Sequence, residues 1–270
     1  MTRIVHLSDL HFGFHREDLV QPLVDLVNAQ RADLIVLTGD LTHRGLPEQL
    51  VQAGEFLGGL RAPWMAVPGN HDVPLYNLPG RFLWPFRGWQ ELIAHDLAPV
   101  RQVGMVRVLG LNSVDPLSWQ RGVIRQGEIA RLTGGLDALS MNIVALHHPL
   151  QHVPGVDKQL ARRAPEALAR LTAAGAHIAL SGHLHRWSAG AFLNPAEGRQ
   201  MLQIQAGTAL CARPSDVVNE FAVLEIPDQS RLRIRRHVAP MAGTGFNDPE
   251  TLLFTRADGV WRAEGAAETG

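Results

Sequence analysis

The stretch that decides the fold is Leu34-Ile35-Val36-Leu37-Thr38-Gly39-Asp40, an apolar, β-branched run that ends in a glycine and a carboxylate. A run of this length and composition predicts a strand that is buried on both faces, as in parallel sheets. Asp40 would then lie just beyond the carboxyl end of the strand, where open α/β sheets bind their ligands. This stretch therefore predicts both an α/β fold and the place of a site.

Four other apolar runs end in the same way, in residue types that bind metals. They are Ile4–Leu7 before Ser8-Asp9-Leu10-His11, Trp64–Val67 before Pro68-Gly69-Asn70-His71-Asp72, Asn142–Leu146 before His147-His148-Pro149, and His177–Leu180 before Ser181-Gly182-His183-Leu184-His185. If all of these runs are strands of parallel sheets, their ends must converge in space. Five strand ends that carry His, Asp or Asn predict one polynuclear metal site.

The composition fits a globular enzyme and argues against several other classes. The chain has 270 residues, of which 46% are hydrophobic and 19% charged, enough for one large domain. A net charge of −1 argues against binding nucleic acid or anionic membranes through bulk charge. The apolar runs are only of strand length, so we expect no membrane span.

The cellular location is predicted from the chain start and from cysteine usage. Met1-Thr2-Arg3 runs directly into an apolar strand, which leaves no room for a signal peptide. The single cysteine, Cys211, fits a reducing compartment. We therefore expect a cytoplasmic protein, and we interpret Cys211 as a small core or edge residue without a role in catalysis.

Helical and strand patterns alternate in the first two thirds of the chain. Apolar spacing predicts helices over residues 18–30, 47–60, 125–139 and 165–174, and a hairpin over residues 100–111 around Gly104. From Arg186 onward the pattern changes to strands alone, expected at residues 187–193, 201–205, 221–226, 232–238, 252–256 and 260–263. The last two strands flank Asp258-Gly259, a good hairpin turn.

Two segments stand apart from this alternation. Residues 73–97 contain Phe82, Trp84, Phe86 and Trp89 among prolines, which is too aromatic for a solvated loop. We expect this segment to be a cap insertion near the mouth of the site rather than a disordered linker. Residues 241–270 are expected to form a C-terminal β-hairpin arm appended to a main domain of residues 1–240.

The strand-end residues form a donor set without thiolate: Asp9, His11, Asp40, Asn70, His147, His183 and His185. Imidazole nitrogens with carboxylate and amide oxygens suit Mn²⁺, Fe²⁺/Fe³⁺ or Zn²⁺. Seven ligands are too many for one tetrahedral ion, but they suffice for two metal ions if one carboxylate, naturally Asp40, bridges them. Two such ions ~3.5–4 Å apart hold a bridging hydroxide and favour in-line attack at phosphorus.

Taken together, the motifs resemble those of the calcineurin-like binuclear metallophosphoesterase family. Asp-x-His, Gly-Asp, Gly-Asn-His-Asp, a lone His after a strand, and Gly-His-x-His follow in the family order over roughly the first 185 residues. The resemblance implies a first metal held by Asp9, His11, Asp40 and His185, and a second held by Asp40, Asn70, His147 and His183. It also implies an α/β (α+β) fold, a four-layer αββα sandwich of two mixed β-sheets with the dimetal site at the strand carboxyl ends.

The same resemblance implies roles for the neighbouring residues. His71 would contact the phosphoryl oxygen or protonate the leaving group. Many members of the family place an aspartate three residues after the bridging Asp to orient this histidine, but here His43 stands at that position. Asp72 then becomes the candidate for orienting His71. Four residues are further candidates for contacting the substrate: His15, Arg16, His43 and His148.

Within the family, the exact motif sequences resemble the bacterial class III cyclic-nucleotide phosphodiesterase branch, which also acts on glycerophosphodiesters and other small diesters. We therefore expect a metal-dependent phosphodiesterase whose partner is a small-molecule phosphodiester, with 3′,5′-cyclic nucleotides as the first substrates to test. The alternatives are a phosphomonoesterase, protein phosphatase or nuclease on the same site, and a non-catalytic scaffold. A nuclease should carry a basic face, which the balanced charge argues against, and a scaffold should have lost ligands, whereas none is missing here. The pattern leaves a homodimer open.

Overall fold

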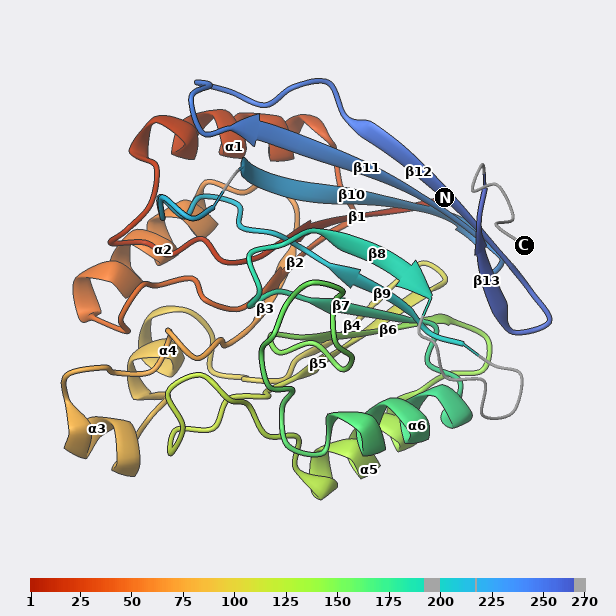
Figure 1. Ribbon diagram of the computed structural model, residues 1–270, viewed down its shortest axis with the longest axis horizontal. Coiled ribbons are helices and arrows are strands. Elements are labelled where there is room, and N and C mark those ends of the chain that lie inside the picture. The colour runs from red at the N-terminus through yellow and green to blue at the C-terminus, as the bar shows by residue number, and fades with distance from the viewer. Residues whose placement is uncertain (192–199, 217, 265–270) are drawn as a thin grey trace.

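The computed structural model describes residues 1–191, 200–216 and 218–264, which fold into four layers (Figure 1). Two sheets lie face to face in the middle. The helices α1 (Glu17–Ala29) and α2 (Pro47–Gly58) cover the first sheet, and α5 (Gln126–Gly135) and α6 (Ala164–Ala174) cover the second. The predicted αββα sandwich is therefore confirmed.

The first sheet has seven strands in the order β13-β12-β11-β10-β1-β2-β3. Their bounds are β1 Thr2–Leu7, β2 Leu34–Thr38, β3 Trp64–Val67, β10 Val218–Asp228, β11 Arg231–Pro240, β12 Glu250–Ala257 and β13 Val260–Ala263. The strands β1, β2 and β3 run parallel, whereas β10 to β13 pair antiparallel. The sheet is mixed, and its parallel part carries three of the five motifs.

The second sheet has six strands in the order β4-β5-β6-β7-β9-β8. Their bounds are β4 Val100–Val103, β5 Val106–Leu111, β6 Met141–Leu146, β7 Ile178–Ser181, β8 Ser188–Ala191 and β9 Leu202–Gln205. Its parallel centre, β5 to β7 and β9, is flanked by antiparallel edge strands. The last residues of the strand expected over 187–193 lie outside the described residues.

Strand β2 shows why its sequence is apolar on both faces. Leu34 and Val36 pack into the core between the two sheets, whereas Ile35 and Leu37 pack under α1 and α2. All five residues of the strand are buried. Each buried aliphatic side chain contributes about 1.5–3 kcal/mol, so the strand and its position in the sheet are strongly specified.

The four predicted helices agree with their predicted ranges to within two residues, except at one end. Helix α5 stops at Gly135, four residues before the predicted end, and Leu136 is already extended. Glycine is about 1 kcal/mol less favourable than alanine inside a helix, so the Gly134-Gly135 pair ends it. Among the residues that the structure describes, no helix has the length and apolar character needed to cross a membrane.

Residues 73–97 contain two short helices, α3 (Leu78–Leu83) and α4 (Arg87–Leu92). Trp89 is fully buried in the core beneath α2, whereas Phe82 and Trp84 are 51% and 61% exposed. The buried Arg81 donates hydrogen bonds to the carbonyl oxygens of Pro74, Pro116 and Ser118, and so ties the segment to the loop at residues 115–120. The cap role of this segment stays a prediction.

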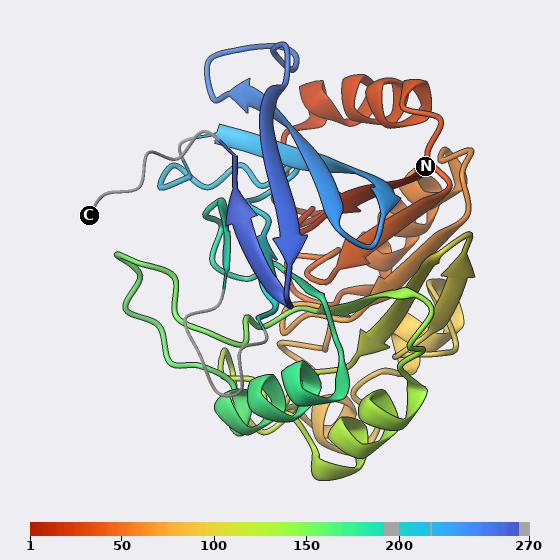
Figure 2. The ribbon, with the colours of Figure 1, turned by 90° about the vertical axis from the view of Figure 1, so that its right-hand side faces the viewer.

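The C-terminal hairpin of β12 and β13 continues the first sheet. Strand β12 pairs with β11 and β13 pairs with β12 (Figure 2). The side chains of Phe254 and Trp261 are buried in the core between the sheets. The hairpin is thus integrated into the main domain rather than appended to it as the arm that we expected over residues 241–270. Residues 265–270 of that range lie outside the described residues.

Candidate metal centre

All seven predicted ligands lie together where β1, β2, β3, β6 and β7 end. Asp40 is at the middle of the group. Its Oδ2 is 3.3 Å from Nε2 of His147 and 3.7 Å from Nε2 of His11. One carboxylate oxygen therefore faces two histidines that come from different sheets, as a bridging ligand would.

The first half of the centre contains Asp9, His11 and His185. The Nε2 atoms of the two histidines are 3.0 Å apart. Asp9 Oδ1 lies 3.2 Å from Nε2 of His185 and 3.7 Å from Nε2 of His11. The donor atoms of these three side chains, with Asp40, converge on one small volume.

The second half contains Asn70, His147 and His183. Asn70 Oδ1 lies 3.2 Å from Nε2 of His147, and the rings of His147 and His183 have centroids 5.1 Å apart. His147 donates from Nδ1 to the Thr38 carbonyl oxygen at 2.7 Å, which turns its Nε2 toward Asp40. The predicted second ligand group is therefore also assembled, and His147 connects it to Asp40.

The backbone conformation orients the side chains of the predicted ligands. Five of the ligands have a positive φ, a conformation that costs energy in residues other than glycine: Asp9 (54°), His11 (54°), Asp40 (52°), His183 (78°) and His185 (53°). The turns also need close packing. A Cβ at Gly69 would lie 2.2 Å from Asp40 Oδ1 and 2.4 Å from the Asp40 nitrogen, so only glycine fits there.

The chemistry of the cluster fits bound cations. Burial alone would raise the pKa of the Asp40 carboxyl, but His147 and His71 hold it well below its usual value. Burial disfavours the charged form of His185, yet Asp9 and Asp216 raise its pKa to about 12. Asp9 Oδ1 is buried, and among the described residues it faces the ring nitrogens of His11 and His185 and no backbone N–H or hydroxyl donor. Inward-facing carboxylates and imidazoles of this kind suit two Mn²⁺, iron or Zn²⁺ ions.

The ligands are themselves held by neighbouring groups. Asp216 Oδ2 lies 2.8 Å from Nδ1 of His185, and so fixes which ring nitrogen faces the centre. Asp9 Oδ2 accepts hydrogen bonds from the Ser8 hydroxyl and from the backbone N–H of His183. Asp216 belongs to no motif, and no sequence pattern predicts its role. Its role follows from the segment after β9, which brings it to His185.

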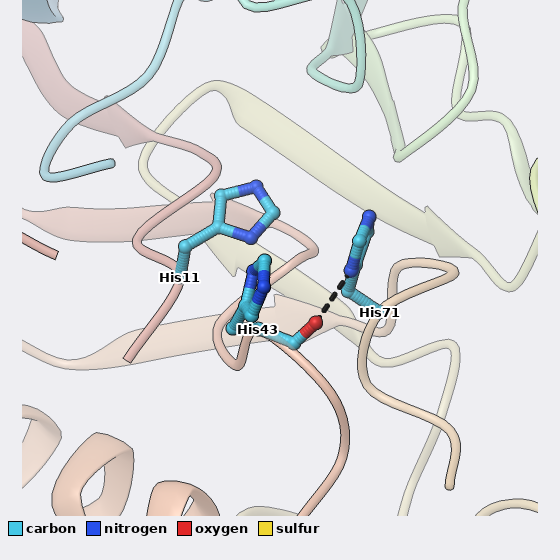
Figure 3. A group of neighbouring side chains, drawn as sticks. All are labelled: His11, His43 and His71. Carbon is cyan, nitrogen blue, oxygen red and sulfur yellow. Dashed lines mark hydrogen bonds between the residues drawn. The ribbon is translucent and has the colours of Figure 1, made fainter. Parts of the chain in front are cut away.

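His71 lies beside the first half of the centre, with its ring centroid 4.9 Å from that of His11 (Figure 3). Its Nδ1 donates to the carbonyl oxygen of His43 at 2.6 Å, and the two rings stack with centroids 5.6 Å apart. His43 thus supports His71 through its backbone and through the face of its ring.

The role that we expected for Asp72 needs correction. Its carboxylate accepts hydrogen bonds from the N–H and hydroxyl of Thr42 and from the N–H of Gly69. These contacts close the turn, while the His43 carbonyl orients His71. Burial and then Asp40 raise the pKa of Asp72 to about 7, which fits a structural carboxyl beside the centre.

The other candidate substrate contacts are engaged with the protein. His148 is buried and bonds through its ring nitrogens to Ser113 Oγ and to the Gln120 carbonyl oxygen, both at 2.9 Å. His15 Nε2 faces Glu17 at 3.2 Å. Arg16 pairs with Asp18 and donates to the carbonyl oxygens of Pro240 and Gly243. The structure therefore does not bring His15 and Arg16 to the ligand group.

Two basic side chains that were not predicted as site residues lie at the centre instead. Arg213 Nη2 lies 3.4 Å from Nε2 of His71, and Lys158 Nζ donates to the His183 carbonyl oxygen at 3.3 Å. Both lie in loops without a motif. A cavity of about 160 Å³ opens beside the second half, lined by His43, Arg44, Asn70, His71, Val73, Leu75, Arg81, Trp119 and Gln120.

Comparison with curated proteins identifies relatives. Over 82 residues the chain is 37% identical to the glycerophosphodiester phosphodiesterase GpdQ of Enterobacter lignolyticus, covering 26% of this chain and 29% of that protein. Over 202 residues it is 30% identical to a probable cyclic nucleotide phosphodiesterase of Synechococcus sp., covering 68% of this chain and 73% of the relative.

A solved structure has the same fold, and one family model matches most of the chain. The purple acid phosphatase PPD1 of yellow lupin has the same fold, with a TM-score of 0.65 at 14% identity over 93% of this chain and 53% of the phosphatase chain. The model of the calcineurin-like phosphoesterase family matches residues 2–187, a range that contains every predicted ligand. With its fold, its five ordered motifs and this match, the chain belongs to the calcineurin-like phosphoesterase family.

Proposed function

We propose that the chain is a metal-dependent phosphodiesterase that hydrolyses small phosphodiesters, with 3′,5′-cyclic nucleotides as the first substrates to test. One observation carries the proposal: a single carboxylate oxygen of Asp40 faces His11 on one side and His147 on the other. This arrangement supports two ions that share one ligand. When bound, such ions activate water and stabilise the charge that develops at phosphorus.

The residues around the centre have their own tasks in this reaction. His71 donates from Nδ1 to the His43 carbonyl oxygen, so its Nε2 is the ring nitrogen from which a leaving oxygen would take a proton. Arg213, beside that nitrogen, offers further donors to the phosphoryl oxygens. Thr38 and Asp216 hold His147 and His185 in the ring orientations that the ligands need.

The cavity beside Asn70 and His71 supports a diester over a monoester. At about 30 Å³ per water molecule, its volume of about 160 Å³ equals roughly five waters, which is room for a ring-sized ester arm. Trp119 is 56% exposed and packs against Arg81, so its ring is available at this wall. A nucleobase stacked on an aromatic ring gains about 1–3 kcal/mol. The similarity to a probable cyclic nucleotide phosphodiesterase of Synechococcus supports the same substrate class.

A substrate panel with Mn²⁺-loaded protein tests the proposal. The substrates are bis-p-nitrophenyl phosphate, p-nitrophenyl phosphate, cyclic AMP and single-stranded DNA. We expect the diester kcat/KM to exceed that of the monoester by at least about tenfold, or ~1.4 kcal/mol. Asp40→Asn, prepared identically, is the control for contaminating hydrolases.

The other outcomes of the panel identify the alternatives. Preference for p-nitrophenyl phosphate would favour a phosphomonoesterase or protein phosphatase, and preference for DNA would favour a nuclease. Failure to hydrolyse any substrate with Mn²⁺, Fe²⁺ or Zn²⁺, although the ions bind, would favour a non-catalytic scaffold.

A further inference from the structure

Cys211 lies buried at the edge of the first half of the metal centre. Its sulfur, a ring nitrogen of His11 and a ring nitrogen of His185 all lie within 4.8 Å of one another. Thiolate sulfur and imidazole nitrogen are the donors that Zn²⁺ takes most often. The spacing therefore allows one ion to contact all three side chains.

The backbone holds this thiol in place. The Cys211 N–H donates to Thr208 Oγ1 at 2.9 Å, and the Thr208 hydroxyl donates to the carbonyl oxygen of Asp9 at 2.7 Å. Asn219 donates to the Cys211 carbonyl oxygen at 3.0 Å. Cys211 is thus connected to the Asp9 motif through one shared hydroxyl, and its position does not depend on a mobile side chain.

A separate observation points to a ligand in the same space. Asp9 is fully buried, and neither a backbone N–H nor a hydroxyl donates to its Oδ1 in the part of the chain that the structure describes. This oxygen faces His185 and His11, at 3.2 and 3.7 Å from their Nε2 atoms. Apart from these two ring nitrogens, no donor in the described part of the chain reaches the oxygen, and a cation bound there would stabilise the buried carboxylate.

We propose that Cys211 is a thiolate ligand of the first metal ion, in addition to Asp9, His11, Asp40 and His185. The thiol proton is released to solvent as the sulfur–metal bond forms. Because soft thiolate ligands favour Zn²⁺ over Mn²⁺, Cys211 makes the first site selective for a thiophilic ion. The inference rests on the metal centre of the proposed function but on no particular substrate.

The competing role for this thiol is support of another ligand. Cys211 also contacts the side chains of His185 and Asp216, so it could hold the imidazole as Asp216 does. The two roles differ in one measurable property, since only a thiolate bonded to the ion produces sulfur-to-metal charge-transfer absorption.

The test compares wild-type protein with Cys211→Ser, each reconstituted with Co²⁺ and separately with Cd²⁺. Because the chain has a single cysteine, any thiolate band reports Cys211. We expect a near-ultraviolet charge-transfer band in the wild type and its loss in Cys211→Ser. A wild type that binds the ions without this band overturns the proposal.

Metal selectivity provides the second readout. In chelator competition, Cys211→Ser should lose at least about tenfold in Zn²⁺ affinity but no more than about twofold in Mn²⁺ affinity. Equal losses for both ions would indicate a supporting role and overturn the proposal. Cys211→Ala serves as a second variant, and the unfolding midpoint in chelator identifies a variant that has lost its fold.

These readouts are independent of hydrolysis. If the diester preference fails while the band and the Zn²⁺ selectivity are found, the assignment of Cys211 stands and only the substrate proposal falls. If the enzyme hydrolyses diesters but shows neither the charge-transfer band nor the Zn²⁺ selectivity, the substrate proposal stands and the assignment of Cys211 falls.

Discussion

Asp216 should control the affinity of the first metal site without contacting the metal. Its carboxylate lies 2.8 Å from Nδ1 of His185 and is only 6% exposed, so the hydrogen bond is protected from water. A hydrogen bond to a charged group contributes about 1.5–3 kcal/mol, against about 0.5–1.5 kcal/mol between neutral groups. Asp216→Asn keeps an acceptor and loses the charge, whereas Asp216→Ala loses both.

The expected magnitudes follow from this difference. The neutral acceptor of Asp216→Asn should cost about 1–1.5 kcal/mol, or roughly tenfold in affinity, and Asp216→Ala up to about 100-fold. One effect works in the opposite direction. Burial lowers the pKa of His185, whereas Asp9 and then Asp216 raise it. Loss of Asp216 therefore lowers the pKa of His185, so the proton competes less strongly with the metal for the imidazole. Losses near neutral pH should therefore lie toward the lower end of each range.

The assay is chelator competition with Mn²⁺ and a count of ions per chain. At limiting Mn²⁺, Asp216→Ala should fall from about two ions to about one, because the second group of ligands is untouched. Asp25→Ala, an exposed position on α1, is the matched control. Wild-type affinity in Asp216→Ala, or equal loss of both ions at an unchanged unfolding midpoint, would refute the reasoning.

Four further predictions follow from the site. Asn70→Ala should release only the second ion, because the first keeps all its expected ligands; metal analysis checks this, and loss of both ions would contradict it. His71→Ala should keep both ions but lose about 10²–10⁴-fold in turnover, less on p-nitrophenyl than on alkyl esters, and equal losses would argue against a leaving-group acid. Gly69→Ala should lower the free energy of unfolding, measured in denaturant, by about 1–3 kcal/mol, because its Cβ would lie 2.4 Å from the Asp40 nitrogen. A variant as stable as the wild type would show that the turn can shift to accommodate the methyl group. Burial lowers but Asp40 raises the pKa of His147, to about 9, so Mn²⁺ affinity should rise between about pH 6 and about pH 9 as that proton is lost, and a flat titration would contradict this.

The strand ends could be predicted because two signals coincide there. Leu34–Thr38 has the bounds that its apolar run indicates, and the carboxylate that follows is placed by the sheet itself. The same holds for the ends of β1, β3, β6 and β7, so topology alone brings the ligand candidates together. Their binding of metal stays a prediction that the metal analysis tests.

What could not be predicted depends on where loops return and on how a turn directs its side chains. Asp216 follows His185 by 31 residues and reaches it only because the segment after β9 folds back. Asp72 is next to His71 in sequence, but the turn points its carboxylate at Thr42 and Gly69. Trp119, in a loop without a motif, lines the cavity beside Asn70 and His71. None of the aromatic residues at positions 82–89, which the composition indicated, lines this cavity.

The left-handed backbone at five ligand positions limits how this centre can be altered or copied. Each such residue costs of order 1–3 kcal/mol and persists only where its surroundings impose it. Grafting the same side chains onto ordinary strand ends of another protein would therefore supply the same ligand types without the orientation that they have here. Within this chain, β-branched residues are excluded at these positions on steric grounds, whatever donor they carry. If the expected ions are removed, the attraction that would oppose this strain is lost, so the three turns that carry these five residues should open before the sheets do.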